Sequence, residues 1–107
     1  MDTYVSINVK QHKNDPVAFE QWAVGRKCTN CGQMTALAVA TDIINKMLHI
    51  QIHNGQLYKN NKSNEFSAGW SFQPDKNQRR NIRFDRGLKD EYKHGLYITI
   101  STKTYGK

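Results

Sequence analysis

The sequence lacks any apolar run close to the roughly 20 residues of a membrane-spanning helix, and its first residues lack the charged and then apolar layout of a signal peptide. Its two cysteines are too few for the disulfide framework of a small secreted domain. It contains no internal repeat and no catalytic or cofactor-binding fingerprint. With 107 residues, the chain is long enough for one core and too short for two. We therefore expect one cytoplasmic domain over residues 1–107, with no membrane partner and no cofactor.

Acidic residues are scarce relative to basic ones, and the excess of basic residues is unevenly distributed along the chain. Nine Asp and Glu stand against sixteen Lys and Arg, which gives a net charge of +7. Residues 1–53 hold five basic and four acidic residues, while residues 54–107 hold eleven and five, so the halves carry +1 and +6. Because phosphate groups attract cations at any base sequence, this pattern predicts a polyanionic partner that contacts the second half.

Hydrophobic periodicity predicts a strand and two helices in the first half. Apolar residues alternate with polar ones over residues 5–9, which is the period of a strand with one buried face. Asp15-Pro16 is typical of a helix start, so we expect a helix over residues 15–25. After a turn, apolar residues recur at largely helical spacing over residues 34–47 and predict the main core helix.

In the second half of the sequence, apolar and polar residues alternate in several short stretches. Residues 48–53 and 56–60 flank Asn54-Gly55, a dipeptide suited to a tight turn, and predict a hairpin. Other elements are a turn at 74–78, a helical turn at 87–94, and strands at 66–73, 80–85 and 96–101. The expected fold class is α+β, with two N-terminal helices packed on one face of an antiparallel sheet of five to six strands. The other face of the sheet is then free for a ligand.

The arginines are concentrated in one segment. Four of the five lie within eight residues. Arginine suits phosphate contact because its planar fork can meet two phosphate oxygens at once, and aromatic rings can stack on unpaired bases. Together they favour RNA or single-stranded DNA as the partner. The predicted nucleic-acid contacts are Lys76, Arg79, Arg80, Arg83, Arg86, Lys89, Trp70 and Tyr92.

The aromatic residues leave two interpretations open. Phe66, Trp70 and Phe72 share one parity of an expected strand, which is more typical of a core than of a base-stacking surface. If they face the core, tyrosines become the stacking candidates, because their polar tips tolerate water. These candidates are Tyr58, Tyr92, Tyr97 and Tyr105.

Two cysteines and two histidines have spacing that resembles a two-Cys two-His zinc site, so zinc is the alternative cofactor. The residues are Cys28, Cys31, His49 and His53. The strand expected over residues 48–53 argues against this zinc site, because residues four apart in a strand are separated by about 13 Å. Both imidazoles then cannot reach one ion bound at about 2 Å.

The cysteines have other interpretations. They are two reduced thiols, a redox pair, or a thiolate nucleophile at Cys31 that uses His53 as its base. A redox pair is disfavoured because we expect the cysteines to follow the end of a helix rather than a strand.

A nuclease is the enzymatic alternative. Metal-independent RNA cleavage needs a general base, a general acid and cations for the charged transition state. Residues of these types in the basic half are Glu65, Arg79, Arg83 and His94.

The best hypothesis is a small, basic, non-enzymatic protein that binds nucleic acid, of the kind that serves phages or mobile elements as a regulator or inhibitor. One alternative is a metal-independent ribonuclease toxin. Another is an interaction module whose basic surface binds an acidic protein.

Overall fold

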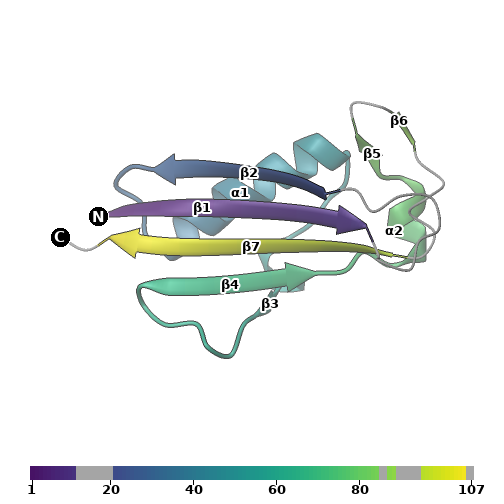
Figure 1. Ribbon diagram of the computed structural model, residues 1–107. Coiled ribbons are helices and arrows are strands. Elements are labelled where there is room, and N and C mark those ends of the chain that lie inside the picture. Colours follow the sequence, from purple (N-terminus) through teal and green to yellow (C-terminus); the bar gives the residue numbers. More distant parts are fainter. Residues whose placement is uncertain (12–20, 85–86, 89–94, 106–107) are drawn as a thin grey trace.

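The computed structural model describes residues 1–11, 21–84, 87–88 and 95–105, which are built around a five-stranded antiparallel sheet (Figure 1). The strand order is β2-β1-β7-β4-β3. β1 and β7 pair over all ten residues of each strand and form the centre of the sheet. The strands are β1 (Asp2–Gln11), β2 (Gln21–Cys28), β3 (Tyr58–Lys59), β4 (Ser67–Phe72) and β7 (Leu96–Tyr105).

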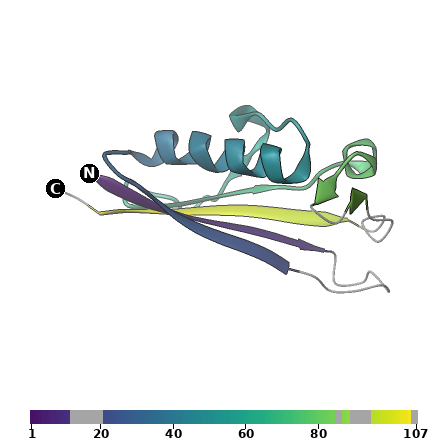
Figure 2. The same ribbon diagram turned by 90° about the horizontal axis from the view of Figure 1, so that it is seen from above.

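One face of the sheet is covered by helix α1 (Gln33–Leu48), as Figure 2 shows. The buried residues of α1 recur at helical spacing and pack against β1 and β7. They are Ala36, Leu37, Ala40, Thr41, Ile44 and Leu48. The facing strand residues include Val5, Ile7, Ile98 and Ile100, all nearly inaccessible to solvent. Each large aliphatic side chain buried in this way contributes about 1.5–3 kcal/mol, so this layer forms the core.

The structure confirms α1 and the strands expected at residues 5–9, 66–73 and 96–101. The expected fold class is wrong, because residues 21–25 of the first expected helix (residues 15–25) form a strand instead. Residues 21–28 are strand β2, which pairs with β1 from Thr3↔Cys28 to Lys10↔Gln21, while residues 15–20 lie outside the described ranges. Pairing with β1 satisfies the backbone of this segment in place of a helix.

The hairpin expected at residues 48–60 is also wrong. Ile50 and Ile52 are buried, as their alternation suggested, but residues 50–53 belong to no strand. The side chain of Asn45 on α1 occupies the place of a neighbouring strand: its Nδ2 donates to the carbonyl oxygen of Ile52 at 3.0 Å, and its Oδ1 accepts from the Ile52 N–H at 2.7 Å. Asn54–Gln56 forms a single 3-10 turn, η1, and β3 pairs with β4 instead.

The arginine-rich segment differs as well. In place of a turn at 74–78 and a strand at 80–85, the chain forms helix α2 (Lys76–Arg80) and a short hairpin of β5 (Arg83–Phe84) and β6 (Gly87–Leu88). Asp75 caps α2 by accepting from the Gln78 N–H, while the Gln78 side chain accepts from the Asp75 N–H. The helical turn expected at 87–94 is β6 at its start, and residues 89–94 lie outside the described ranges. Neither α1 nor α2 is long and apolar enough to cross a bilayer.

Replacing Asn45 with alanine tests the side-chain clamp on Ile52. We expect the free energy of unfolding to fall by about 1–3 kcal/mol, because two half-buried backbone groups lose their hydrogen-bond partner. Urea denaturation followed by circular dichroism measures the change. The matched control is Asp42→Ala on the same helix, which removes only an exposed ion pair with Lys46 and should cost less than about 0.5 kcal/mol. Equal losses in the two variants would contradict the clamp.

Candidate nucleic-acid interface

The sheet face opposite α1 is covered by none of the described elements (Figure 2), and we call it the open face. Residues paired directly across antiparallel strands point to the same side, so the register arranges the open-face side chains in rows across the strands. Across β2, β1, β7 and β4, two adjacent rows contain only small side chains and one asparagine, and we call these rows the small-residue band. One row is Gly25, Ser6, Ser101 and Gly69, and the other is Ala23, Asn8, Thr99 and Ser71.

Lysines and tyrosines flank the small-residue band on both sides. Lys27, Tyr4 and Lys103 form the row at one side, and Lys10 pairs with Tyr97 at the other. Along β7 the rows of Lys103 and Tyr97 are six residues apart, or about 20 Å. The open face therefore combines a broad hydroxyl-bearing strip with cations and aromatic rings at its borders.

The ring of Tyr4 lies across the sheet toward β2. A Cβ atom placed on Gly25 would lie only 2.6 Å from the Tyr4 hydroxyl oxygen and 3.2 Å from its ring. Only glycine at position 25 leaves room for the ring in this position. Because Tyr4 is 46% exposed, part of it remains accessible to a ligand.

Two further tyrosines border the open face. Tyr105, at the end of β7, is 57% exposed, and the Lys103 Nζ lies 5.7 Å from its ring centroid. Tyr58 on β3 pairs with Ser71 and is 79% exposed. Tyr58, Tyr97 and Tyr105 are three of the four tyrosines that the sequence suggests for stacking when the strand aromatics face the core. The fourth, Tyr92, lies outside the described ranges.

Asp2 is a carboxylate of this face, and it lies at the same end as Lys27. Its Oδ1 accepts from the Asn30 N–H at 3.0 Å, and its Oδ2 lies 3.6 Å from the Lys27 Nζ. The backbone hydrogen bond from Asn30, followed by the charge of Lys27, lowers the pKa of Asp2 below its usual value. Asp2 is therefore ionised at neutral pH and offsets part of the charge of Lys27, while Lys10 and Lys103 are exposed on the same face.

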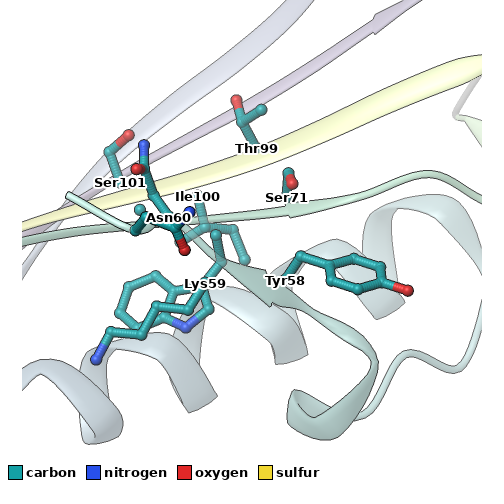
Figure 3. Close-up of a pocket in the computed structure, with 10 residues that line it drawn as sticks. Tyr58, Lys59, Asn60, Ser71, Thr99, Ile100 and Ser101 are labelled. Carbon is teal, nitrogen blue, oxygen red and sulfur yellow. The ribbon is translucent and has the colours of Figure 1, made fainter. Parts of the chain in front are cut away.

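A hollow of about 520 Å³ lies at the β3 side of the open face (Figure 3). Its lining includes Tyr58, Asn60, Ser71, Thr99 and Ser101. In Figure 3 the side chains of Ser71, Thr99, Ser101 and Asn60 lie on the side of the sheet away from α1. The hollow therefore continues the small-residue band toward β3. Sequence patterns did not indicate it, because consecutive asparagines at 60 and 61 are typical of an ordinary polar loop.

Trp70 does not join this surface, which corrects its prediction as a nucleic-acid contact. It is 6% exposed, and the Lys59 Nζ lies 5.7 Å from its ring centroid. Phe72 is buried too, so both rings belong to the core, whereas Phe66 is 55% exposed. The alternation of β4 explains why Ser71 differs from its neighbours: Trp70 and Phe72 point toward α1, and Ser71 points to the open face.

Two of the predicted arginine contacts, Arg79 and Arg80, lie apart from the open face. Figures 1 and 2 place α2 beyond the end of β4, on the α1 side. Arg79 is half-buried and donates from Nη1 to the carbonyl oxygen of Pro74 at 2.8 Å, whereas Lys76 and Arg80 are exposed. Arg83 belongs to β5, and Arg86 and Lys89 lie outside the described ranges. We call Lys76, Arg79 and Arg80 the basic turn.

Two residues of the nuclease alternative, Glu65 and Arg79, are not brought together. Glu65 precedes β4 and Arg79 follows it, so the length of a six-residue strand, about 20 Å, separates them. Arg83 is on β5, and His94 lies outside the described ranges.

The zinc alternative is also not supported by the geometry. Cys28 and Cys31 are joined in a disulfide between the end of β2 and the start of α1, so they are neither reduced thiols nor thiolate ligands. His49 caps the opposite end of α1, a 16-residue helix about 24 Å long, and His53 follows it. The described residues include no group of three or more His, Cys, Asp or Glu that could hold a metal ion. The same separation removes His53 as a base for Cys31. The objection to a redox pair no longer holds, because the cysteines do follow a strand.

No protein-family model matches the sequence, and no curated protein or solved structure is significantly similar to it. Its function therefore has to be argued from the geometry of the open face.

Replacing both cysteines with serine tests the disulfide. Closing a four-residue loop limits the unfolded chain, so the Cys28→Ser/Cys31→Ser variant should lose roughly 2 kcal/mol of unfolding free energy. Urea denaturation measures this loss, and adding a reductant to the variant should change nothing further. A bound zinc ion in the parent protein, with both thiols reactive before any reduction, would contradict the disulfide.

Proposed function

We propose that this protein binds single-stranded nucleic acid, RNA or DNA, on the open face of its sheet. The observation that carries the proposal is the arrangement of this face, in which tyrosines and lysines border a strip of small hydroxyl side chains. Aromatic rings on a sheet surface stack on unpaired bases, and lysines neutralise the phosphates between them.

The register supports a single strand rather than a duplex. The tyrosines belong to rows about 20 Å apart along β7, so a bound chain meets rings at both borders of the band. Such rings can stack only on bases that are not already paired and stacked within a duplex. The hydroxyls of Ser6, Thr99 and Ser101 provide both donors and acceptors for sugars and base edges.

The charge of the molecule agrees with this partner. The excess of +7 attracts a polyanion, and the exposed Lys76 and Arg80 extend the basic surface beyond the end of the sheet. Among the strand residues that the structure describes, the cations of the open face are Lys10, Lys27 and Lys103.

Removing one charge from the open face tests the phosphate contacts. We expect Lys103→Gln to weaken binding of labelled single-stranded RNA and DNA and to reduce the salt slope of the logarithm of affinity by about 0.7. Fluorescence anisotropy at several salt concentrations measures both. Lys46→Gln is the matched control, because it removes the same charge from the exposed side of α1. Equal salt slopes in the two variants would mean that the nucleic acid binds elsewhere on the protein.

Removing one ring from the open face tests stacking. Tyr105→Ala should cost about 1–3 kcal/mol of binding free energy, or roughly 5- to 150-fold in affinity. The matched control is Phe66→Ala. It removes a similarly exposed ring whose position in the alternation belongs to the α1 side of the sheet, so this variant should bind as the parent does.

Two further results would overturn the proposal. Absence of oligonucleotide binding by the parent protein would leave the acidic-protein alternative. Cleavage of the RNA, seen on a gel after the titration, would favour the ribonuclease alternative.

A further inference from the structure

The hollow at the β3 side of the open face is organised around Asn60. The Asn60 N–H donates to the carbonyl oxygen of Gly69 at 2.7 Å, which fixes Asn60 beside β4. Its side-chain Oδ1 accepts from the Lys62 N–H at 2.9 Å. This second bond leaves the amide nitrogen turned over Gly69, 3.9 Å from where a Cβ would stand. Asn60 therefore presents its donor side to the hollow.

The amide donors of Asn60 are available to a ligand. Within the described residues, the Asn60 Nδ2 makes no hydrogen bond, and the same holds for the hydroxyls of Ser71, Thr99 and Ser101. Figure 3 shows these side chains on one side of the sheet, and Gly69, which has no side chain, lines the same hollow. The hollow thus offers two fixed amide donors and three hydroxyls that either donate or accept.

The hollow carries no cation on its open side, among the residues that the structure describes. Lys59, although part of the lining, directs its Nζ over the Trp70 ring. A phosphate placed here would lack a charge partner, whereas the carbonyl and ring-nitrogen acceptors of a neutral base match the amide and hydroxyl donors. The nearby Tyr58 ring, 79% exposed, offers a stacking surface.

We propose that this hollow is a subsite for one unpaired nucleobase, which stacks on Tyr58 and accepts hydrogen bonds from the side-chain amide of Asn60. Its volume of about 520 Å³ falls within the range of pockets for small ligands, about 300–1,000 Å³. The inference rests on the proposed function, since it adds a base-specific contact to strand binding on the open face.

Changing the amide of Asn60 to a carboxylate gives the sharpest test. Asn60→Asp keeps an oxygen to accept from the Lys62 N–H but replaces the two donors with a second acceptor. We expect the affinity for single-stranded oligonucleotides to fall tenfold or more. Asn64→Asp is the matched control: it adds the same charge to the same loop and keeps the oxygen that accepts from the Phe66 and Ser67 N–H groups. The affinity of this control variant should fall only by the small amount that the added negative charge causes.

A steric variant tests the same site without a change of charge. Gly69→Val fills the hollow between Asn60 and Ser101, and a Cβ at Gly69 would make only ordinary contacts, with the Asn60 Cβ at 3.7 Å and the Ile100 carbonyl oxygen at 3.8 Å. We expect a loss of affinity similar to that of Asn60→Asp. Its control is Ser67→Val, on the same strand and face but outside the hollow.

Neutral nucleosides separate base recognition from phosphate binding. Uridine or adenosine should shift the backbone amide signals of Asn60, Gly69 and Ser101 in the NMR spectrum of the parent protein and not in that of Asn60→Asp, while inorganic phosphate should leave them unchanged. If the parent binds oligonucleotides but Asn60→Asp and Asn64→Asp bind equally well, the subsite is refuted and strand binding stands. If the parent binds no oligonucleotide, the proposed function fails as a whole.

Discussion

The pairing of β1 with β7 is the constraint on which the rest of the structure depends. It fixes ten consecutive residue pairs at the centre of the sheet, from Asp2↔Tyr105 to Gln11↔Leu96. Because side chains alternate between faces, a slip of one residue would turn Val5 and Ile7 to solvent and bury Ser6 and Asn8. The apolar core beneath α1 therefore selects the register, and the same register assembles the open face. Core and site are specified together.

The two faces of the sheet differ in how they use polar groups. Where the α1 side contains hydroxyls, they are paired: the Thr3 Oγ1 donates to the Cys31 carbonyl oxygen at 2.6 Å and lies 2.9 Å from the Thr104 Oγ1. These contacts satisfy buried polar atoms where β2 passes into α1, beside the disulfide. On the open face, the hydroxyls of Ser71, Thr99 and Ser101 make no such contacts within the described ranges, so water or a ligand satisfies them. Stability thus depends on the α1 side of the sheet, whereas the open face is the surface on which we propose recognition.

Sequence patterns predicted the elements whose periodicity was set by the core. The alternation of Val5, Ile7 and Val9 and the helical spacing over residues 34–47 led directly to β1 and α1. These patterns failed where a side chain replaced the backbone pairing of a strand. Asn45 hydrogen-bonds the backbone of Ile52 in place of a neighbouring strand, so the alternation of buried residues there did not produce a hairpin. β2 was missed because Pro16 suggested a helix start.

Two other features that the sequence analysis missed are helix α2 and the group of open-face lysines. Local sequence indicates the first but not the second. Asp75 and Gln78 have the spacing of a capping box, a local pattern that by itself indicates the start of α2. The open-face lysines are a different case, since Lys10, Lys27 and Lys103 are far apart in the sequence and become neighbours only through strand register. Counting charge along the chain directed attention to the arginines instead. Long-range pairing of this kind cannot be read from local composition.

The position of the basic turn relative to the open face divides the electrostatic roles. Screening limits the reach of an exposed charge to about 8 Å at physiological ionic strength, so the lysines within the rows act directly on a strand bound there. For the proposed nucleic-acid partner, the role of Lys76 and Arg80, beyond the end of the sheet, is a long-range attraction that raises the association rate. Arg79 has a structural use as well, because its guanidinium holds the Pro74 carbonyl that leads into the capped helix. In the proposed function, the exposed cations of the basic turn attract the polyanion toward the protein, and the dispersed lysines of the sheet hold it.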